Sequence, residues 1–193
     1  YTQSLGVANY LKQQHSAKII EKSIIFNKLI KLPNFCLVNG VAIDKKNSDV
    51  LDKKYPDLII STGRKLAHAA LYIKKLSIGK SKVLQIMRPN YALKNFDVIA
   101  IAEHDHYQYN DTRVIRTIGS PNIISEAYIK QASTNLETKL AKLAKPRIAV
   151  IIGGSSKDQN VKQTQFIKFA KNINKICQQL NGSAIITSSP RTG

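Results

Sequence analysis

The stretch Asp57–Leu76, DLIISTGRKLAHAALYIKKL, joins a short apolar run to an amphipathic one. Its opening segment, Asp57–Ser61, predicts a buried β-strand because apolar residues follow one another without polar interruption. Lys65–Leu76 predicts a helix, since its apolar side chains recur at helical spacing, namely Leu66, Ala69, Ala70 and Ile73. A buried strand, a tight turn and a helix together form the repeating unit of an α/β sheet.

Three further apolar runs follow this unit, Val83–Met87, Asp97–Ala102 and Val114–Ile118. They are apolar throughout rather than alternating, which is typical of parallel strands covered on both faces. Residues 1–122 therefore predict a doubly wound, Rossmann-like parallel sheet. Earlier in the chain we expect a strand at Ala17–Ile24, a helix at 26–32, and a strand or buried turn at Phe35–Val41.

A second unit follows a helix expected over residues 123–144, which Pro146 ends. Arg147–Ile152 predicts a strand, residues 161–180 an amphipathic helix and Ala184–Thr187 another strand. This pattern divides the chain into an N-terminal Rossmann-like domain at 1–122, a linker helix at 123–145 and a second Rossmann-like domain at 146–193. Two strands and one helix are too few for a stable domain. The chain also opens in a helical pattern with no strand before it, so we expect a fragment of a longer protein.

The chain carries a formal net charge of +18. Lys outnumbers Arg 24 to 6, and the lysines are scattered along the chain rather than gathered with aromatic residues. Because Lys is encoded by A/T-rich codons and base-reading Arg is scarce, we expect no sequence-specific nucleic-acid binding. Attraction to an acidic membrane surface or another polyanion is expected instead, and salt should weaken it. With no signal peptide and no membrane-spanning run, the expected location is the cytoplasm, with peripheral association at the inner face of a membrane.

Small polar residues follow several of the predicted strands, at the sheet edge where α/β proteins bind ligands. A phosphate-binding loop is predicted after Ile152, formed by Gly153, Gly154, Ser155, Ser156 and Lys157. Its glycines let backbone N–H groups approach an anion, and the next helix N-terminus favours negative charge. The alternative is a tight turn with a capping serine. Gly63 and Arg64, and Arg191 after the last strand, are further anion-binding candidates.

The tetrad Glu103-His104-Asp105-His106 follows the Asp97–Ala102 strand. His104 is a candidate general base, with Glu103 or Asp105 orienting its imidazole. On an extended strand His104 and His106 would face opposite sides, so we predict no metal site here. Polar residues at a strand exit without chemistry are the alternative. His15 and His68 lie alone on predicted helices and are interpreted as structural or exposed.

Short motifs in a fixed order give the chain a family resemblance. They are Thr2-Gln3-Ser4-Leu5-Gly6, Ser61-Thr62-Gly63-Arg64, Leu84-Gln85-Ile86-Met87-Arg88-Pro89, Ala102-Glu103-His104-Asp105, Ile118-Gly119-Ser120-Pro121-Asn122, Ile152-Gly153-Gly154-Ser155-Ser156-Lys157 and Thr187-Ser188-Ser189-Pro190-Arg191-Thr192. Over nearly its whole length the chain resembles the mitochondrial-fission "elongated mitochondria" family. The A/T-rich composition favours one of its bacterial members, which have been labelled nucleoside-diphosphate-sugar epimerases.

The resemblance implies a GT-B glycosyltransferase-like fold of two Rossmann-like domains. It also implies an enzyme that uses a nucleotide sugar as substrate and needs no cofactor, with His104 as base and the Gly153–Lys157 loop holding phosphate. Epimerase chemistry is disfavoured because the Gly-x-Gly-x-x-Gly fingerprint is absent. The alternatives are a non-catalytic adaptor for a protein partner, since plant members are implicated in recruiting a dynamin-related protein, and a basic polyanion-binding module.

Overall fold

The computed structural model describes residues 1–51, 54–105, 110–153 and 162–188. The chain folds into two compact units, Tyr1–Ser125 and Glu126–Gly193. The first contains the helices α1 (Thr2–His15) and α2 (Arg64–Leu76). Its strands are β1 (Leu58–Thr62), β2 (Lys82–Ile86), β3 (Val98–Ala102) and β4 (Val114–Thr117). The second contains α3 (Glu126–Leu140), β5 (Arg147–Ile152), α4 (Gln163–Gln179) and β6 (Ser183–Ser188).

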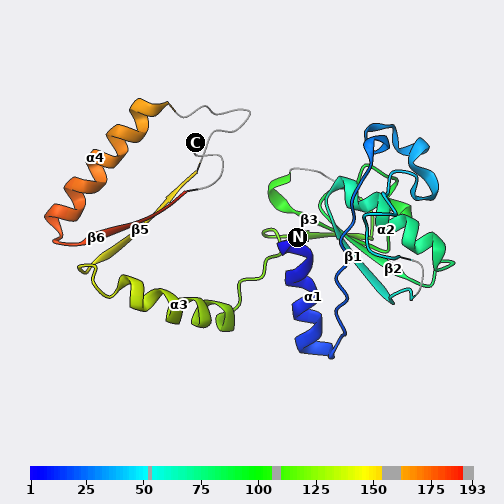
Figure 1. Ribbon diagram of the computed structural model, residues 1–193, viewed down its shortest axis with the longest axis horizontal. Helices are drawn as coiled ribbons and strands as arrows, with labels where there is room; N and C mark the ends of the chain where they lie inside the picture. Colours follow the sequence, from blue (N-terminus) through cyan, green and yellow to red (C-terminus); the bar gives the residue numbers. More distant parts are fainter. Residues whose placement is uncertain (52–53, 106–109, 154–161, 189–193) are drawn as a thin grey trace. The chain divides into compact units, whose positions relative to one another are not determined.

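The first unit is built on a four-stranded sheet in the order β1-β2-β3-β4 (Figure 1). Every neighbouring pair is parallel, with Ile59 beside Val83, Gln85 beside Ile99 and Ala100 beside Ile115. This confirms the α/β, Rossmann-like sheet that the continuous apolar strands predict. Because the four strands point the same way, their carboxyl ends meet at one edge of the sheet.

The core lies between α2 and one face of this sheet. Helix α2 buries Ala67, Ala70 and Ile73 there, and the strands and the following loop supply the rest of the cluster, Ile59, Val83, Phe96, Ile99 and Ile101. On the opposite face, Ile86 and Ala102 at the strand ends are buried, whereas Ile60, Leu84 and Ala100 are half-buried. Near β1, helix α1 lies close to the sheet. The edge strand β4 is more open still, with the Ile115 side chain exposed.

The segment Ala17–Ile24 forms no strand, so the expectation there is wrong. At its carboxyl end the backbone amides bond to side chains instead of to a strand. The Ser23 amide donates to the Asp49 carboxylate over 2.6 Å, and the Ile25 amide donates to the Ser48 hydroxyl over 2.9 Å. Around Ser23 and Ile25, side chains thus accept amide hydrogen bonds that a partner strand would have accepted.

Two 3₁₀ helices, η1 (Lys28–Lys31) and η2 (Asn34–Gly40), follow this segment. The helix expected at 26–32 is therefore shortened to one 3₁₀ turn. At 35–41 the structure contains the turn rather than the strand.

The second unit holds β5 and β6 as a parallel pair, with Arg147 beside Ser183 and Ile152 beside Ser188. Helix α4 packs against β6. Gly182 lies where the chain turns from α4 into β6, and a Cβ there would lie 2.4 Å from the Pro146 carbonyl oxygen. A residue without a side chain is therefore needed for this close approach. In the described part of the chain no helix is long and apolar enough to cross a membrane.

Candidate functional site

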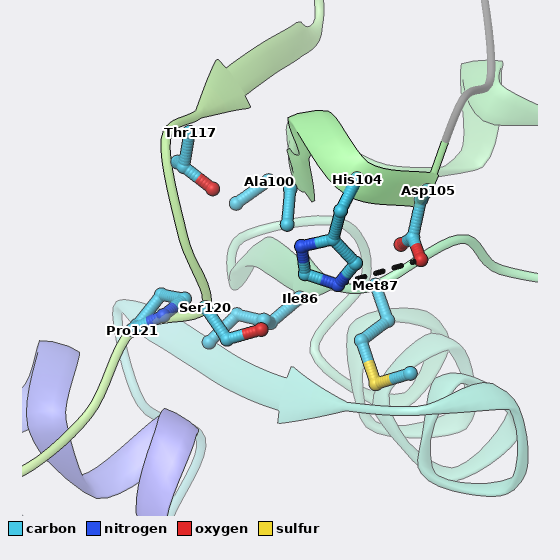
Figure 2. A pocket seen from close by; sticks show the side chains of 9 residues that line it. Ile86, Met87, Ala100, His104, Asp105, Thr117, Ser120 and Pro121 are labelled. Atoms are coloured by element: carbon cyan, nitrogen blue, oxygen red, sulfur yellow. Dashed lines mark ion pairs between the residues drawn. The ribbon is translucent and has the colours of Figure 1, made fainter. Parts of the chain in front are cut away.

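The carboxyl ends of β2, β3 and β4 surround a shallow hollow of about 30 Å³ in the first unit (Figure 2). Its lining comes from three separate stretches of chain, namely Ile86 and Met87, then Ala100, Ala102, His104 and Asp105, and lastly Thr117, Ser120 and Pro121. Ligands of open parallel sheets bind beyond this edge. The hollow is therefore the candidate functional site of this unit.

His104 lies on η4 (Glu103–Asp105), a 3₁₀ turn directly after β3. Its side chain is 66% exposed, and Nε2 lies 3.9 Å from Asp105 Oδ1, a distance that suits an ion pair once the imidazole is protonated. In Figure 2 the ring stands between Ser120 and Met87, with its second nitrogen on the side facing Thr117. A ligand in the hollow can thus approach the ring, while the Asp105 carboxylate lies close to Nε2.

The 3₁₀ turn corrects the expectation that the tetrad continues as an extended strand, because the chain leaves the sheet at Ala102. His106 lies outside the described residues. Glu103 is exposed, and its backbone carbonyl accepts a hydrogen bond from Arg116 Nη2 at 3.3 Å. Between the two acidic candidates, the structure brings the Asp105 carboxylate to the imidazole.

Two residues at this edge have a left-handed backbone. Gly63, after β1, has φ +85°, which glycine adopts at no steric cost. Met87, after β2, has φ +71° although it carries a side chain, and its amide donates to the Ala100 carbonyl over 2.9 Å. Such a backbone in a non-glycine residue costs roughly 1–3 kcal/mol and is found most often at functional sites.

A buried amide organises the neighbouring β1–α2 turn. Gln85 is fully buried on β2, and its Oε1 accepts from the Ser61 hydroxyl over 2.6 Å. Its Nε2 donates to the carbonyls of Ile86 and Gly63 over 2.8 and 3.2 Å. The Gly63 amide also donates to the Ile86 carbonyl over 3.0 Å. Gln85 therefore ties β1, β2 and the start of α2 together.

Helix α2 begins at this turn, with Gly63 as its N-cap and no side chain bonded to its first amides. Arg64, its first residue, is exposed and forms no ion pair with any residue that the structure describes. Open helix amides and a guanidinium favour an anion such as a phosphate or carboxylate. The placement that the sequence suggests for Gly63 and Arg64 is thus the observed one, while anion binding there stays a prediction.

Helix α1 meets the same edge through two close contacts. Ser4 Oγ and Thr62 Oγ1 lie 2.6 Å apart in a hydrogen bond. A Cβ on Gly6 would lie 2.1 Å from the Asn122 carbonyl oxygen, so the helix rests directly on the 119–122 loop. Three of the ordered motifs are thereby brought together. The sequence signals this contact only through the glycine, whose small size permits the approach.

Polar atoms without partners are also present around this edge. Gln3 Oε1 on α1 and Thr117 Oγ1 on β4 are buried and lack a hydrogen-bond partner among the described residues. Thr117 lines the hollow. Gln3 belongs to one of the ordered motifs and Thr117 to none, but an unpaired buried group is visible only once the fold is known. Buried polar groups are nearly always satisfied, so these two atoms are exceptions within the described part of the chain.

The predicted phosphate loop is described only at Gly153, which is exposed and has open space around its Cα. Gly154, Ser155, Ser156, Lys157 and Arg191 lie outside the described residues, and their role stays a prediction. Helix α4 begins at Gln163, with Lys162 as its N-cap residue. The residue that caps α4 is therefore not a serine, and the turn itself lies outside the described residues.

No group of three His, Cys, Asp or Glu side chains that could hold a metal ion occurs within the described ranges. The parallel sheet, with its polar residues collected at the carboxyl edge, defines a Rossmann-like α/β protein. The sequence profile of the Mitochondrial fission ELM1 family matches residues 1–193, and the chain belongs to this family.

A relative is found in Rickettsia prowazekii (strain Madrid E), an uncharacterized protein that is 28% identical over 212 aligned residues. The alignment covers 94% of this chain and 60% of that protein, so the chain spans less than two thirds of its relative. No solved structure matches the chain.

Proposed function

We propose that the protein is a GT-B-type glycosyltransferase that moves a sugar from a nucleotide sugar to an acceptor hydroxyl. The observation that supports this most directly is the exposed His104 imidazole, which lines a hollow at the carboxyl edge with Asp105 near its Nε2. A base, an orienting carboxylate and an open approach are the parts that deprotonation of a hydroxyl requires.

In this mechanism the acceptor hydroxyl lies in the hollow beside His104. As the acceptor oxygen bonds to the anomeric carbon of the sugar, Nδ1 takes its proton. The bond between that carbon and the diphosphate oxygen breaks, and the nucleoside diphosphate leaves with the electron pair. Asp105, 3.9 Å from Nε2, stabilises the imidazolium that forms.

The leaving diphosphate needs positive charge or backbone amides. At the described edge these are Arg64 and the open amides of α2, whose start is held by Gln85. The Gly153–Lys157 loop is the second candidate, with two serine hydroxyls and a lysine in its sequence. Each charge-assisted hydrogen bond to phosphate contributes roughly 1.5–3 kcal/mol.

The test measures sugar transfer and nucleotide-sugar hydrolysis by the intact protein over a panel of UDP- and GDP-sugars. His104→Ala should lower turnover at least about a hundredfold, the usual contribution of a general base. His15→Ala is the matched control, because His15 is an exposed histidine on α1, and it should leave turnover unchanged. Circular dichroism and melting temperature establish that both variants fold.

A second arm separates nucleotide binding from general attraction to polyanions. Gly154→Val should remove UDP or GDP binding at moderate salt while heparin binding persists. If no nucleotide sugar is turned over and both nucleotides fail to bind, the enzyme proposal is wrong and the non-catalytic adaptor is favoured. Turnover that survives His104→Ala would leave the enzyme but remove this histidine from its mechanism.

A further inference from the structure

Two neighbouring strands of the first unit leave the sheet through a residue with a left-handed backbone. Thr62 of β1 and Ile86 of β2 are partners in the parallel register. Each is followed by such a residue, Gly63 with φ +85° and Met87 with φ +71°. Glycine adopts this conformation at no steric cost, whereas a residue with a Cβ is strained by it. The same position on two adjacent strands thus holds glycine once and a long side chain once.

The main chain, and not the Met87 side chain, sets this backbone path. The Met87 amide continues the ladder between β2 and β3 by donating to the Ala100 carbonyl over 2.9 Å. The Met87 side chain is 43% exposed, although Ile86 directly before it is only 2% exposed. Packing against the fold therefore offsets the strain only in part. Strained residues of this kind cluster at ligand-binding sites, where the strained residue itself is used.

Met87 lies in the wall of the hollow at His104. In Figure 2 the side chains of Met87 and Ser120 stand on opposite sides of the imidazole ring. The Ser120 hydroxyl can donate and accept hydrogen bonds, whereas a thioether has no hydrogen to donate and accepts only weakly. A molecule bound beside His104 thus meets a hydrogen-bonding group on one side and an apolar, adaptable side chain on the other.

The other apolar side chains of the hollow are less open than Met87. Ile86 and Ala102 are buried, and Ala100 and Pro121 are half-buried. Met87 is therefore the most exposed apolar side chain in this lining. An apolar group of a bound molecule would lose its contact with water chiefly by covering Met87, and the free energy of such burial grows with the area covered.

We propose that Met87 is a specificity-determining residue of this site, whose side chain packs against an apolar group of the acceptor. The inference rests on the proposed function in one respect, namely that the molecule beside His104 is the acceptor of sugar transfer. It names the acceptor class, an alcohol whose hydroxyl is joined to an alkyl or aryl body, in preference to an alcohol that is polar all round. Contact with this body offsets the strain of the Met87 backbone.

The first test uses oxidation of Met87, which is the only methionine of the chain. Hydrogen peroxide transfers one oxygen atom to the sulfur, which is oxidised to a sulfoxide, while the peroxide is reduced to water. Mass spectrometry of the peptide that contains Met87 gives the rate of this reaction in the intact protein. Hexyl β-glucoside and phenyl β-glucoside, the alkyl and aryl probes, should slow the oxidation severalfold. Methyl β-glucoside at the same concentration should not.

Each outcome of this test decides the proposal. Protection by one probe or by both supports it and distinguishes an alkyl from an aryl body. If neither probe slows the oxidation, or if methyl β-glucoside slows it equally, the proposal is overturned. The measurement requires no turnover, so its result is separate from that of the sugar-transfer assay.

Substitutions separate the contact from the strain. Met87→Asn removes the apolar side chain but suits a left-handed backbone, so the variant should fold. It should weaken the protecting probe at least about fivefold, roughly the value of one or two buried methylene groups. Met87→Leu keeps an apolar side chain of similar size and should bind the probe within about twofold of the wild type. Ligand-observed NMR on the intact protein gives the dissociation constants.

Ile78→Asn is the matched control. Ile78 also has a left-handed backbone, with φ +55°, but it is 89% exposed in the turn after α2 and lies outside the hollow. This variant should bind the probe as the wild type does. If Met87→Asn is folded by circular dichroism and binds as tightly as the wild type, the side-chain contact does not exist and the inference fails. Should Met87→Asn not fold, the oxidation experiment still decides.

Discussion

Replacing Gln85 by leucine tests how the β1–α2 turn is held. Leucine fills a similar volume but cannot accept the Ser61 hydroxyl or donate to the Ile86 and Gly63 carbonyls. The two carbonyls keep a second partner, since Ile86 accepts from the Gly63 amide and Gly63 from the Ala67 amide. Ser61, only 5% exposed, keeps none of its described side-chain partners. The substitution therefore leaves one group, the Ser61 hydroxyl, without a hydrogen-bond partner among the described side chains.

The magnitude follows from these contacts. Leaving the Ser61 hydroxyl unsatisfied costs about 1–3 kcal/mol, and each lost carbonyl bond about 0.5–1.5 kcal/mol. Part of this lost stability is recovered, because burying leucine does not require polar atoms to be removed from water, as burying an amide does. We expect the variant to be less stable by about 2–3 kcal/mol. For a unit of this size that lowers the melting temperature by roughly 10 °C.

The assay is thermal and urea unfolding of the intact protein, followed by circular dichroism. A double-mutant cycle with Ser61→Ala isolates the hydroxyl, because removing it also removes the unsatisfied group. The double variant should be more stable than Gln85→Leu alone by about 1 kcal/mol or more. If Gln85→Leu is as stable as the wild type, or if the two substitutions simply add, the reasoning about this turn is refuted.

Two further predictions concern stability. Gly6→Val should detach α1 from the sheet and lower the melting temperature by several degrees, because its Cβ would overlap the Asn122 carbonyl. The control in the same melting experiment is Gly119→Val, at a glycine with open space around it. Burial by itself would raise the pKa of Asp97, but hydrogen bonds from Lys74 and the Val83 amide outweigh it and lower the pKa. Asp97 thus stabilises the folded state above the ordinary carboxyl range and loses this contribution as the pH falls below about 4. Asp97→Asn should therefore cost about 1–2 kcal/mol at pH 7 and progressively less in acid, and a cost that stays constant from pH 7 to pH 3 would contradict this.

The sequence by itself determined the parallel sheet and its helices. Apolar runs such as Asp57–Ser61 are too short and too uniform for an amphipathic helix, and the helical spacing within Lys65–Leu76 identifies the face that packs on the core. The boundaries agree closely, with β1 at Leu58–Thr62 and α2 at Arg64–Leu76. Both signals are local, because they depend on residues a few positions apart along the chain.

The candidate site could be located but not assembled from the sequence. Residues after parallel strands must share one edge, which is why His104 and Gly63 could be singled out. That Asp105 rather than Glu103 lies near the imidazole depends on the 3₁₀ turn, and that turn arises where the chain leaves the sheet. Met87 adopts φ +71° although its residue type gives no sign of it.

Only the tertiary structure decided the features that join distant parts of the chain. Ala17–Ile24 has strand-like composition, yet at its end the Asp49 and Ser48 side chains accept from the Ser23 and Ile25 amides. The contact of α1 with the 119–122 loop joins Gly6 to a segment more than a hundred residues away. His68 Nε2 and the Tyr91 hydroxyl are buried without a hydrogen-bond partner among the described residues, and their residue types give no sign of this. Whether a polar atom is satisfied depends on every group around it in space, and sequence patterning carries information only about groups nearby along the chain.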